Sequence, residues 1–119
     1  MKRKLSLMVM SGVEDGTLLE FATAKGDGEA LSDKWTLSIG RRDENDISLR
    51  NDTYVSRQHA RLHLKNDDWW LEDLNSTNGS FIENSDDFFD DQPVKGFVQL
   101  TGDHLFRVGR TWLRIQKTE

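Results

Sequence analysis

The sequence predicts an all-β fold, a sandwich or barrel of short strands, and three observations carry this prediction. Apolar and polar residues alternate with a period of two in several short segments, as they do in half-buried strands. Turn-forming residues separate these segments at close spacing. No stretch of ten or more residues has convincing helical periodicity. Many short strands without helices indicate a β-sandwich or barrel.

The alternating segments each place their apolar residues on one face. In chain order these faces hold Leu5, Leu7 and Val9; Trp35, Leu37 and Ile39; Ala60, Leu62 and Leu64; and Leu113 and Ile115. In the third segment the opposite face holds His59, Arg61, His63 and Lys65. Each pattern is typical of a strand with one buried face.

Two hairpins are predicted, each with a two-residue turn. Their turns and strands are Asn66-Asp67 between residues 59–65 and 69–74, and Gly109-Arg110 between residues 105–108 and 111–116. The least regular stretch runs from Glu83 to Gly96 and places four aspartates around Phe88-Phe89. This stretch is interpreted either as a solvated loop whose phenylalanines return to the core, or as an edge that docks a partner.

Composition limits the class of protein. A chain of 119 residues suits a single domain spanning residues 1–119, and a monomer is the simplest expectation. The net charge of −5 disfavours binding to nucleic acid or to an anionic membrane. There is no cysteine, which excludes disulfides and thiolate chemistry and favours a reducing compartment, the cytoplasm. No apolar run has membrane-spanning length.

Three loop segments concentrate the candidate functional residues. They cover residues 39–49, 55–59 and 73–81. Each segment lies at the end of a predicted strand, so a sandwich can bring all three to one rim, where loops carry function.

The polar side chains of these loops suit an anion. Arg41 and Arg57 offer planar guanidinium groups that match phosphate oxygens bidentately. Ser56 and Thr77 offer hydroxyl donors, and the amide of Asn78 can hold the backbone of an extended peptide. The set lacks an acceptor-only group aimed at its centre, as an anion site requires.

The order and spacing of these motifs resemble the signature of the forkhead-associated (FHA) domain. The matching segments are Gly40-Arg41, Ser56-Arg57-Gln58-His59 and Ser76-Thr77-Asn78-Gly79, with supporting positions at residues 45–47, 70–74, 102–103 and 108–109. The resemblance covers roughly residues 35–116, which is most of the chain. Three motifs in the right order within a β-rich domain are a specific signal.

The resemblance implies an eleven-stranded β-sandwich of two packed sheets that recognises phosphothreonine in partner proteins of kinase signalling. It implies that Arg41 and Ser56 bind the phosphate, that Thr77 and Arg57 assist, and that Asn78 holds the peptide main chain. It further implies structural roles for Gly40, His59 and Gly79: the glycines permit turns, and the histidine braces the loop that presents the serine.

Competing functions are weaker. A hydrolase triad of Ser56, His59 and Asp73 lacks a nucleophile elbow, so no catalysis and no cofactor are expected. A metal site built from histidines 59, 63 and 104 fails, because the first two would lie about 13 Å apart along one strand. The serious alternative is a phosphate-independent interaction or assembly module on the same sandwich, using a sheet face or the acidic loop around Phe88-Phe89.

Overall fold

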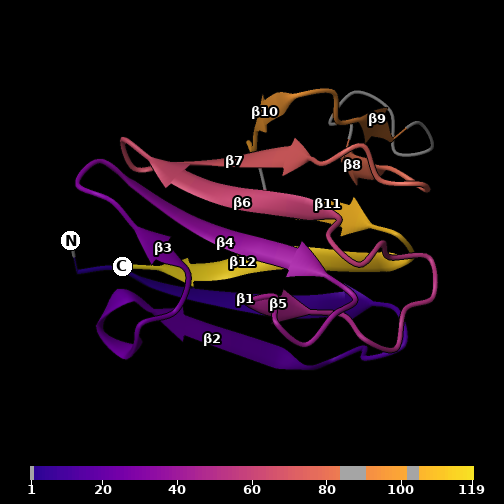
Figure 1. Ribbon diagram of the computed structural model, residues 1–119, viewed down its shortest axis with the longest axis horizontal. Coiled ribbons are helices and arrows are strands. Elements are labelled where there is room, and N and C mark those ends of the chain that lie inside the picture. The colour runs from indigo at the N-terminus through magenta and orange to yellow at the C-terminus, as the bar shows by residue number, and fades with distance from the viewer. Residues whose placement is uncertain (1, 84–90, 102–104) are drawn as a thin grey trace.

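Two six-stranded β-sheets pack face to face in the computed structural model, which describes residues 2–83, 91–101 and 105–119 (Figure 1). The first sheet has the order β2-β1-β12-β11-β8-β9. Its strands are β2 (Leu18–Ala22), β1 (Lys4–Ser11), β12 (Thr111–Thr118), β11 (Leu105–Val108), β8 (Ser80–Ile82) and β9 (Gln92–Pro93). Neighbouring strands of this sheet are antiparallel.

The second sheet carries the loop segments that hold the candidate residues. It has the order β10-β7-β6-β4-β3, and β5 pairs with β4 in parallel. Its strands are β10 (Phe97–Gln99), β7 (Asp68–Asp73), β6 (Ala60–Lys65), β4 (Lys34–Gly40), β3 (Glu29–Ala30) and β5 (Ile47–Ser48). A short 3₁₀ helix, η1 (Thr23–Lys25), follows β2. The predicted β-sandwich is therefore confirmed, with twelve strands among the described residues where the resemblance implied eleven.

Both predicted hairpins are present. Strands β6 and β7 pair with Lys65 opposite Asp68. Asn66 and Asp67 connect them with φ angles of 52° and 66°, the left-handed values that a tight hairpin turn requires. Strands β11 and β12 are joined through Gly109, whose φ is 58°. Asparagine, aspartate and glycine adopt this conformation more readily than other residues, which explains why the turns could be located from sequence.

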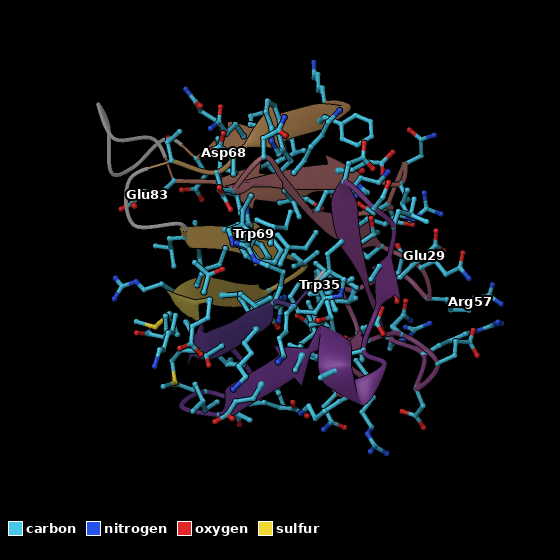
Figure 2. All side chains as sticks on the ribbon, turned by 90° about the vertical axis from the view of Figure 1, so that its left-hand side faces the viewer. Glu29, Trp35, Arg57, Asp68, Trp69 and Glu83 are labelled. Atoms are coloured by element: carbon cyan, nitrogen blue, oxygen red, sulfur yellow. The ribbon has the colours of Figure 1, made fainter. Side chains whose placement is uncertain are left out.

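The core lies between the two sheets and contains the predicted apolar faces. Every apolar residue named above for the four alternating segments is buried. Trp35 and Trp69 meet at the centre with ring centroids 6.0 Å apart, and Figure 2 shows both between the layers. Large aromatic side chains bury much apolar area each, which suits a small core.

His63 departs from the exposure that its position suggests. It lies on the outer face of β6, as the alternation predicts, yet only 4% of it is exposed. Phe97 of β10 covers it, with ring centroids 5.2 Å apart. The hydroxyl of Thr36 donates to its Nδ1 at 2.8 Å, and its Nε2 donates to Glu72 at 3.0 Å. Burial lowers the pKa of this imidazole, partly offset by Glu72.

The two ends of the chain lie side by side at one end of the sandwich. The backbones of Lys4 and Glu119 exchange two hydrogen bonds, of 3.0 and 2.9 Å. Three features considered in the sequence lie outside the described residues: the Phe88-Phe89 loop, Gly102-Asp103 and His104. Within the described residues, no helix is long and apolar enough to cross a membrane.

Candidate functional site

The three predicted loop segments meet at one end of the second sheet, on the right of Figure 1. Backbone hydrogen bonds link the first segment to the second and the second to the third. The N–H of Arg41 donates to the carbonyl of Ser56 at 3.0 Å, and the N–H of Leu74 donates to the carbonyl of His59 at 2.9 Å. The loops are therefore fixed to one another, and the end of β4 holds the serine segment in place.

A pocket of about 330 Å³ opens between these loops. It is lined by Arg41, Thr53, Tyr54, Val55, Ser56, Arg57, Thr77 and Asn78. All five residues predicted to contact a ligand thus line one pocket. Three further residues line the pocket: Val55, which begins the predicted segment 55–59, and Thr53 and Tyr54, which immediately precede that segment.

Ser56 and Thr77 are adjacent in the lining of the pocket. The backbone N–H of Thr77 donates to the Oγ of Ser56 at 3.2 Å, so the serine hydrogen remains available for a ligand. Asn78 donates from its Nδ2 to the carbonyl of Tyr54 at 2.9 Å. Its amide oxygen then remains as an acceptor for the N–H of a bound peptide.

The arginines of the pocket are not neutralised by the protein. Within the described residues, neither Arg41 nor Arg57 has a carboxylate within 4.0 Å, and Figure 2 shows Arg57 extending away from the body of the domain. The neighbouring Arg42 differs, because its Nη1 lies 3.5 Å from Glu44. Two guanidinium groups without a carboxylate partner among the described residues, beside hydroxyl donors, have the chemistry that suits an anion.

His59 holds the loop that carries Ser56 through hydrogen bonds to two backbone groups. It is fully buried, its Nδ1 accepts the backbone N–H of Ser56 at 2.9 Å, and its Nε2 donates to the carbonyl of Gly79 at 2.8 Å. These bonds require the neutral imidazole with its proton on Nε2. Burial lowers the pKa of His59, and the Gly79 carbonyl and Asp73 offset this only in part. The neutral form is therefore the one that the fold maintains.

Asp73 fixes the Ser-Thr-Asn-Gly turn. Its Oδ1 accepts hydrogen bonds from the hydroxyls of Ser76 and Ser80 at 2.7 and 2.6 Å. Its Oδ2 accepts the N–H of Ser76 at 3.0 Å, and the N–H of Gly79 donates to the Oγ of Ser76 at 2.9 Å. Gly79 has a φ of 83°, which other residues rarely adopt. The turn expected from Asn-Gly is real and carries two pocket residues.

Gly40 is required by close packing. A Cβ at this position would overlap the carbonyl oxygen of Arg57 and lie 2.6 Å from the Nδ2 of Asn45. The amide of Asn45 donates to the carbonyls of Arg42 and Arg57, both at 2.9 Å. A side chain at position 40 would therefore separate the loop that carries Arg41 from the loop that carries Ser56.

Asp52 is a positioning residue that the sequence analysis missed. It is buried, and its Oδ1 accepts the N–H of Tyr54 at 2.9 Å. Its Oδ2 accepts the N–H of Arg110 at 2.9 Å and the hydroxyl of Thr111 at 2.7 Å. The guanidinium of Arg110 then lies 3.7 Å above the ring of Tyr54. The β11–β12 turn is thus fastened to the pocket loop.

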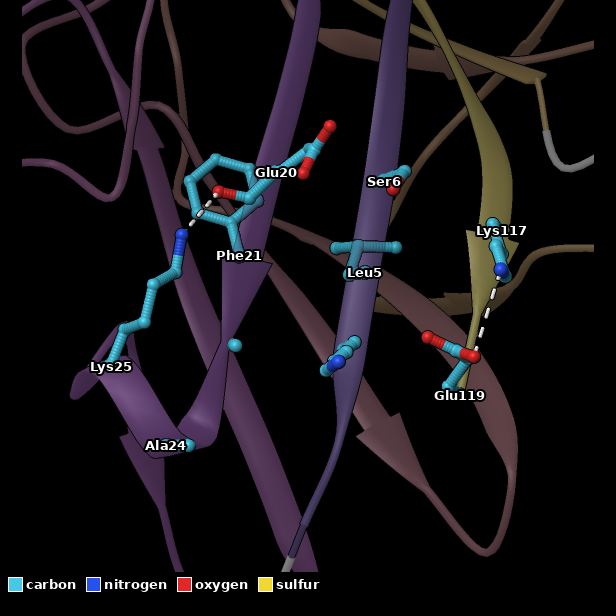
Figure 3. A pocket seen from close by; sticks show the side chains of 10 residues that line it. Leu5, Ser6, Glu20, Phe21, Ala24, Lys25, Lys117 and Glu119 are labelled. Carbon is cyan, nitrogen blue, oxygen red and sulfur yellow. Dashed lines mark hydrogen bonds and ion pairs between the residues drawn. The ribbon is translucent and has the colours of Figure 1, made fainter.

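A larger hollow of about 570 Å³ lies over β1, β2 and β12 and contains none of these residues (Figure 3). Two of its charged side chains, Lys25 and Lys117, already have partners. Lys25 donates to the carbonyl of Glu20 at 3.4 Å, and Lys117 lies 3.6 Å from Glu119. This hollow is larger than the pocket between the loops, so the candidate residues, and not the size of the cavity, identify the candidate site.

Comparison with known proteins agrees with this geometry. Residues 37–109 match the family model of the FHA domain. FHA domain-containing protein FhaB of Mycobacterium tuberculosis is 44% identical over 45 residues, which cover 38% of this chain and 28% of that protein. Glycogen accumulation regulator GarA of the same organism is 33% identical over 75 residues, covering 63% of this chain and 41% of that protein. The matches therefore span less than half the length of these relatives.

A solved structure is similar to this chain over nearly its whole length. A domain studied for its phosphothreonine-dependent FHA interactions superposes with a TM-score of 0.66 at 25% sequence identity. The superposition covers 98% of this chain and 97% of that chain. The likeness therefore includes the first two strands, which lie outside the matched family segment.

Proposed function

The chain belongs to the FHA domain family, and from this premise we propose that it binds phosphothreonine-containing segments of a partner protein in kinase signalling. The observation that carries the proposal is the pocket in which Arg41, Ser56, Arg57, Thr77 and Asn78 meet, with no carboxylate of the described residues paired to either arginine. A phosphate monoester supplies the charge and the acceptor oxygens that this set of donors lacks.

Each side chain has a proposed role. Arg41 and Ser56 hold the phosphate, the first through its guanidinium and the second through its hydroxyl, while Arg57 and Thr77 add further donors. Asn78 holds the peptide main chain through its amide oxygen, because its Nδ2 already donates to Tyr54. Charge-assisted hydrogen bonds contribute about 1.5–3 kcal/mol each, so two or three of them with peptide contacts reach about micromolar affinity.

Gly40, His59 and Gly79 act in this proposal as structural supports. Gly40 allows the Arg41 and Ser56 loops to approach, Gly79 supplies a left-handed turn, and His59 connects the two halves of the pocket. Mutation of these residues should act through the position of the pocket loops, since none of the three lines the pocket.

We propose that the domain is not an enzyme. Both ring nitrogens of His59 are occupied by backbone groups, so the imidazole is not placed as a base for the Ser56 hydroxyl. The absence of cysteine supports the cytoplasm as its compartment, and the net charge of −5 argues against contact with nucleic acid or an anionic membrane. A monomer is the simplest state for a domain of this size.

The test is a titration with a peptide pool that has phosphothreonine at its centre and random residues around it. The best binder is then synthesised with phosphothreonine, phosphoserine or threonine at that position. We expect saturable binding that needs the phosphate. We also expect weaker binding of phosphoserine by about fourfold, because burial of one methyl group contributes about 0.8 kcal/mol. Equal binding of the threonine peptide would refute the proposal.

Two arginine variants test whether the phosphate binds at Arg41. Arg41→Ala should weaken binding by about tenfold or more, because it removes a charge-assisted contact. Arg42→Ala is the matched control, since Arg42 is adjacent but pairs with Glu44 and does not line the pocket. Phosphopeptide binding that survives Arg41→Ala would instead favour a phosphate-independent interaction module.

A further inference from the structure

A second concave surface lies on the outer face of the sheet that carries the pocket loops. This groove has a volume of about 310 Å³ and is lined by Lys34, His63, Lys65, Trp70 and Phe97. The five residues come from β4, β6, β7 and β10. None of them lines the phosphate pocket.

Cross-strand pairing explains the aromatic floor of the groove. His63 of β6 is opposite Trp70 of β7, and both lie on the outer face. Phe97, from the edge strand β10, places its ring over His63 at a centroid distance of 5.2 Å. Phe97 is nevertheless 57% exposed, a large value for a phenylalanine on a folded surface. An exposed phenylalanine beside a partly exposed tryptophan is characteristic of interaction sites.

Two lysines bound the groove, and their arrangement is unfavourable in the free domain. Lys34 of β4 and Lys65 of β6 are register partners, so two like charges lie directly opposite each other, which destabilises a sheet. Within the described part of the chain, neither forms an ion pair, and Asp68 across the hairpin from Lys65 does not neutralise it. An acidic occupant would remove this repulsion.

The groove and the pocket lie at opposite ends of the same strands. Lys34 is the first residue of β4, and Gly40, which precedes Arg41, is the last. Six residues of extended chain separate them by about 20 Å. Occupation of one surface therefore leaves the other accessible.

We propose that this groove is a second docking surface, which binds an unphosphorylated acidic segment that carries an apolar side chain. The apolar side chain packs on Phe97 and Trp70, and the carboxylates of the segment pair with Lys34 and Lys65. The charge of the lysine pair, opposite in sign to the net charge of the chain, selects an acidic partner over a neutral one. Binding at this groove does not require the phosphothreonine activity proposed above.

The test uses a synthetic unphosphorylated peptide in which Phe and Leu are separated by pairs of Asp and Glu, titrated into isotope-labelled domain and followed by backbone NMR shifts. A second peptide has Lys in place of every acidic residue. We expect saturable shifts at the groove residues with the acidic peptide, weakening as salt is added, and none with the basic peptide. Absence of saturable binding, or shifts centred on Arg41 and Arg57, would overturn the proposal.

Charge reversal separates this surface from the phosphate pocket. The double variant Lys34→Glu/Lys65→Glu should weaken acidic-peptide binding by about tenfold or more while keeping phosphothreonine-peptide affinity within about twofold. Lys117→Glu, an exposed lysine on β12, is the matched control. Phe97→Ser reports the apolar contribution. Equal weakening by Lys117→Glu would show general charge attraction and overturn the proposal, whereas failure of phosphopeptide binding alone would affect only the proposed function.

Discussion

The Nδ1 of His59 accepts the backbone N–H of Ser56 at 2.9 Å, so a buried imidazole sets the position of the serine at the pocket. The other ring nitrogen of His59 donates to Gly79 at 2.8 Å. One side chain therefore connects the loop before β6 with the turn before β8. These two loops supply four of the five proposed ligand contacts, so the geometry of the pocket depends on a residue that does not line it.

Replacement of His59 by alanine should affect both stability and binding. The N–H of Ser56 and the carbonyl of Gly79 would each lose a partner, at a cost of about 1–3 kcal/mol per buried group. We therefore expect the free energy of unfolding in urea to fall by at least about 2 kcal/mol. Phosphopeptide affinity, measured by calorimetry where the variant is fully folded, should fall by about tenfold.

The matched control is His63→Ala. This histidine is also buried and makes two hydrogen bonds, but with side chains on the outer face of the sheet. It should lower stability and leave phosphopeptide affinity close to that of the wild type. Equal loss of affinity in both variants would mean that binding reports only general destabilisation.

Stability should decrease below neutral pH because of these two histidines. Burial lowers the pKa of each in the folded state from its ordinary value of 6.5. The unfolded chain therefore takes up protons at a higher pH than the folded chain does, and protonation favours unfolding. The stabilisation is complete above pH 6.5 and is lost progressively as the pH falls toward the lowered pKa values.

Urea unfolding at several pH values between 7.5 and 5.5 tests this linkage. Each histidine can contribute a slope of at most about 1.4 kcal/mol per pH unit. His63→Gln should flatten the profile by removing one of the two contributions. A wild-type domain that becomes more stable between pH 6.5 and 5.5 would contradict the expected sign.

Much of the fold could be predicted because local patterns determine it. Alternation identified the buried faces of four strands, and Asn66-Asp67 and Gly109 marked turns that need left-handed backbone. The pocket residues could be grouped because each followed or preceded a predicted strand. These signals lie within a few residues of the feature that they predict.

The features that could not be predicted depend on contacts distant in sequence. The burial of His63 depends on Phe97, which is contributed by a strand on the far side of β7. The role of Asp52 depends on donors at positions 110 and 111. Strand alternation indicates which face a side chain occupies, but it does not show what covers that face.

Gly40→Ala should disturb the site although alanine is a small residue. Its Cβ would overlap the carbonyl of Arg57 and approach Asn45, so the two pocket loops must separate. We expect a loss of about 1–3 kcal/mol in stability, typical of overpacking, and weaker phosphopeptide binding. Gly16→Ala is the comparison, because its Cβ would meet nothing within 4 Å and only its φ of 86° is unfavourable. Gly16→Ala should reduce stability without reducing affinity, and the opposite ranking of affinities would refute this account of Gly40.

Asp52 joins the β11–β12 turn to the loop that presents Ser56, and it receives three hydrogen bonds inside the protein. Two of its donors are backbone N–H groups, those of Tyr54 and Arg110, which lose this acceptor when the carboxylate is removed. Asp52→Ala should therefore lower the free energy of unfolding by about 3 kcal/mol, since bonds to a charged acceptor are the stronger kind.

Asp52→Asn removes the charge at this position and keeps a side chain of nearly the same shape. An amide retains one acceptor oxygen, so it can keep the bonds of either Oδ1 or Oδ2 but not both sets. We expect a stability between those of the wild type and Asp52→Ala, measured by urea unfolding. Glu44→Ala is the surface control, because this carboxylate is exposed and its ion pair with Arg42 contributes little. If Asp52→Ala were no more destabilising than Glu44→Ala, the turn would not depend on Asp52, and the position of Arg110 over Tyr54 would need another cause.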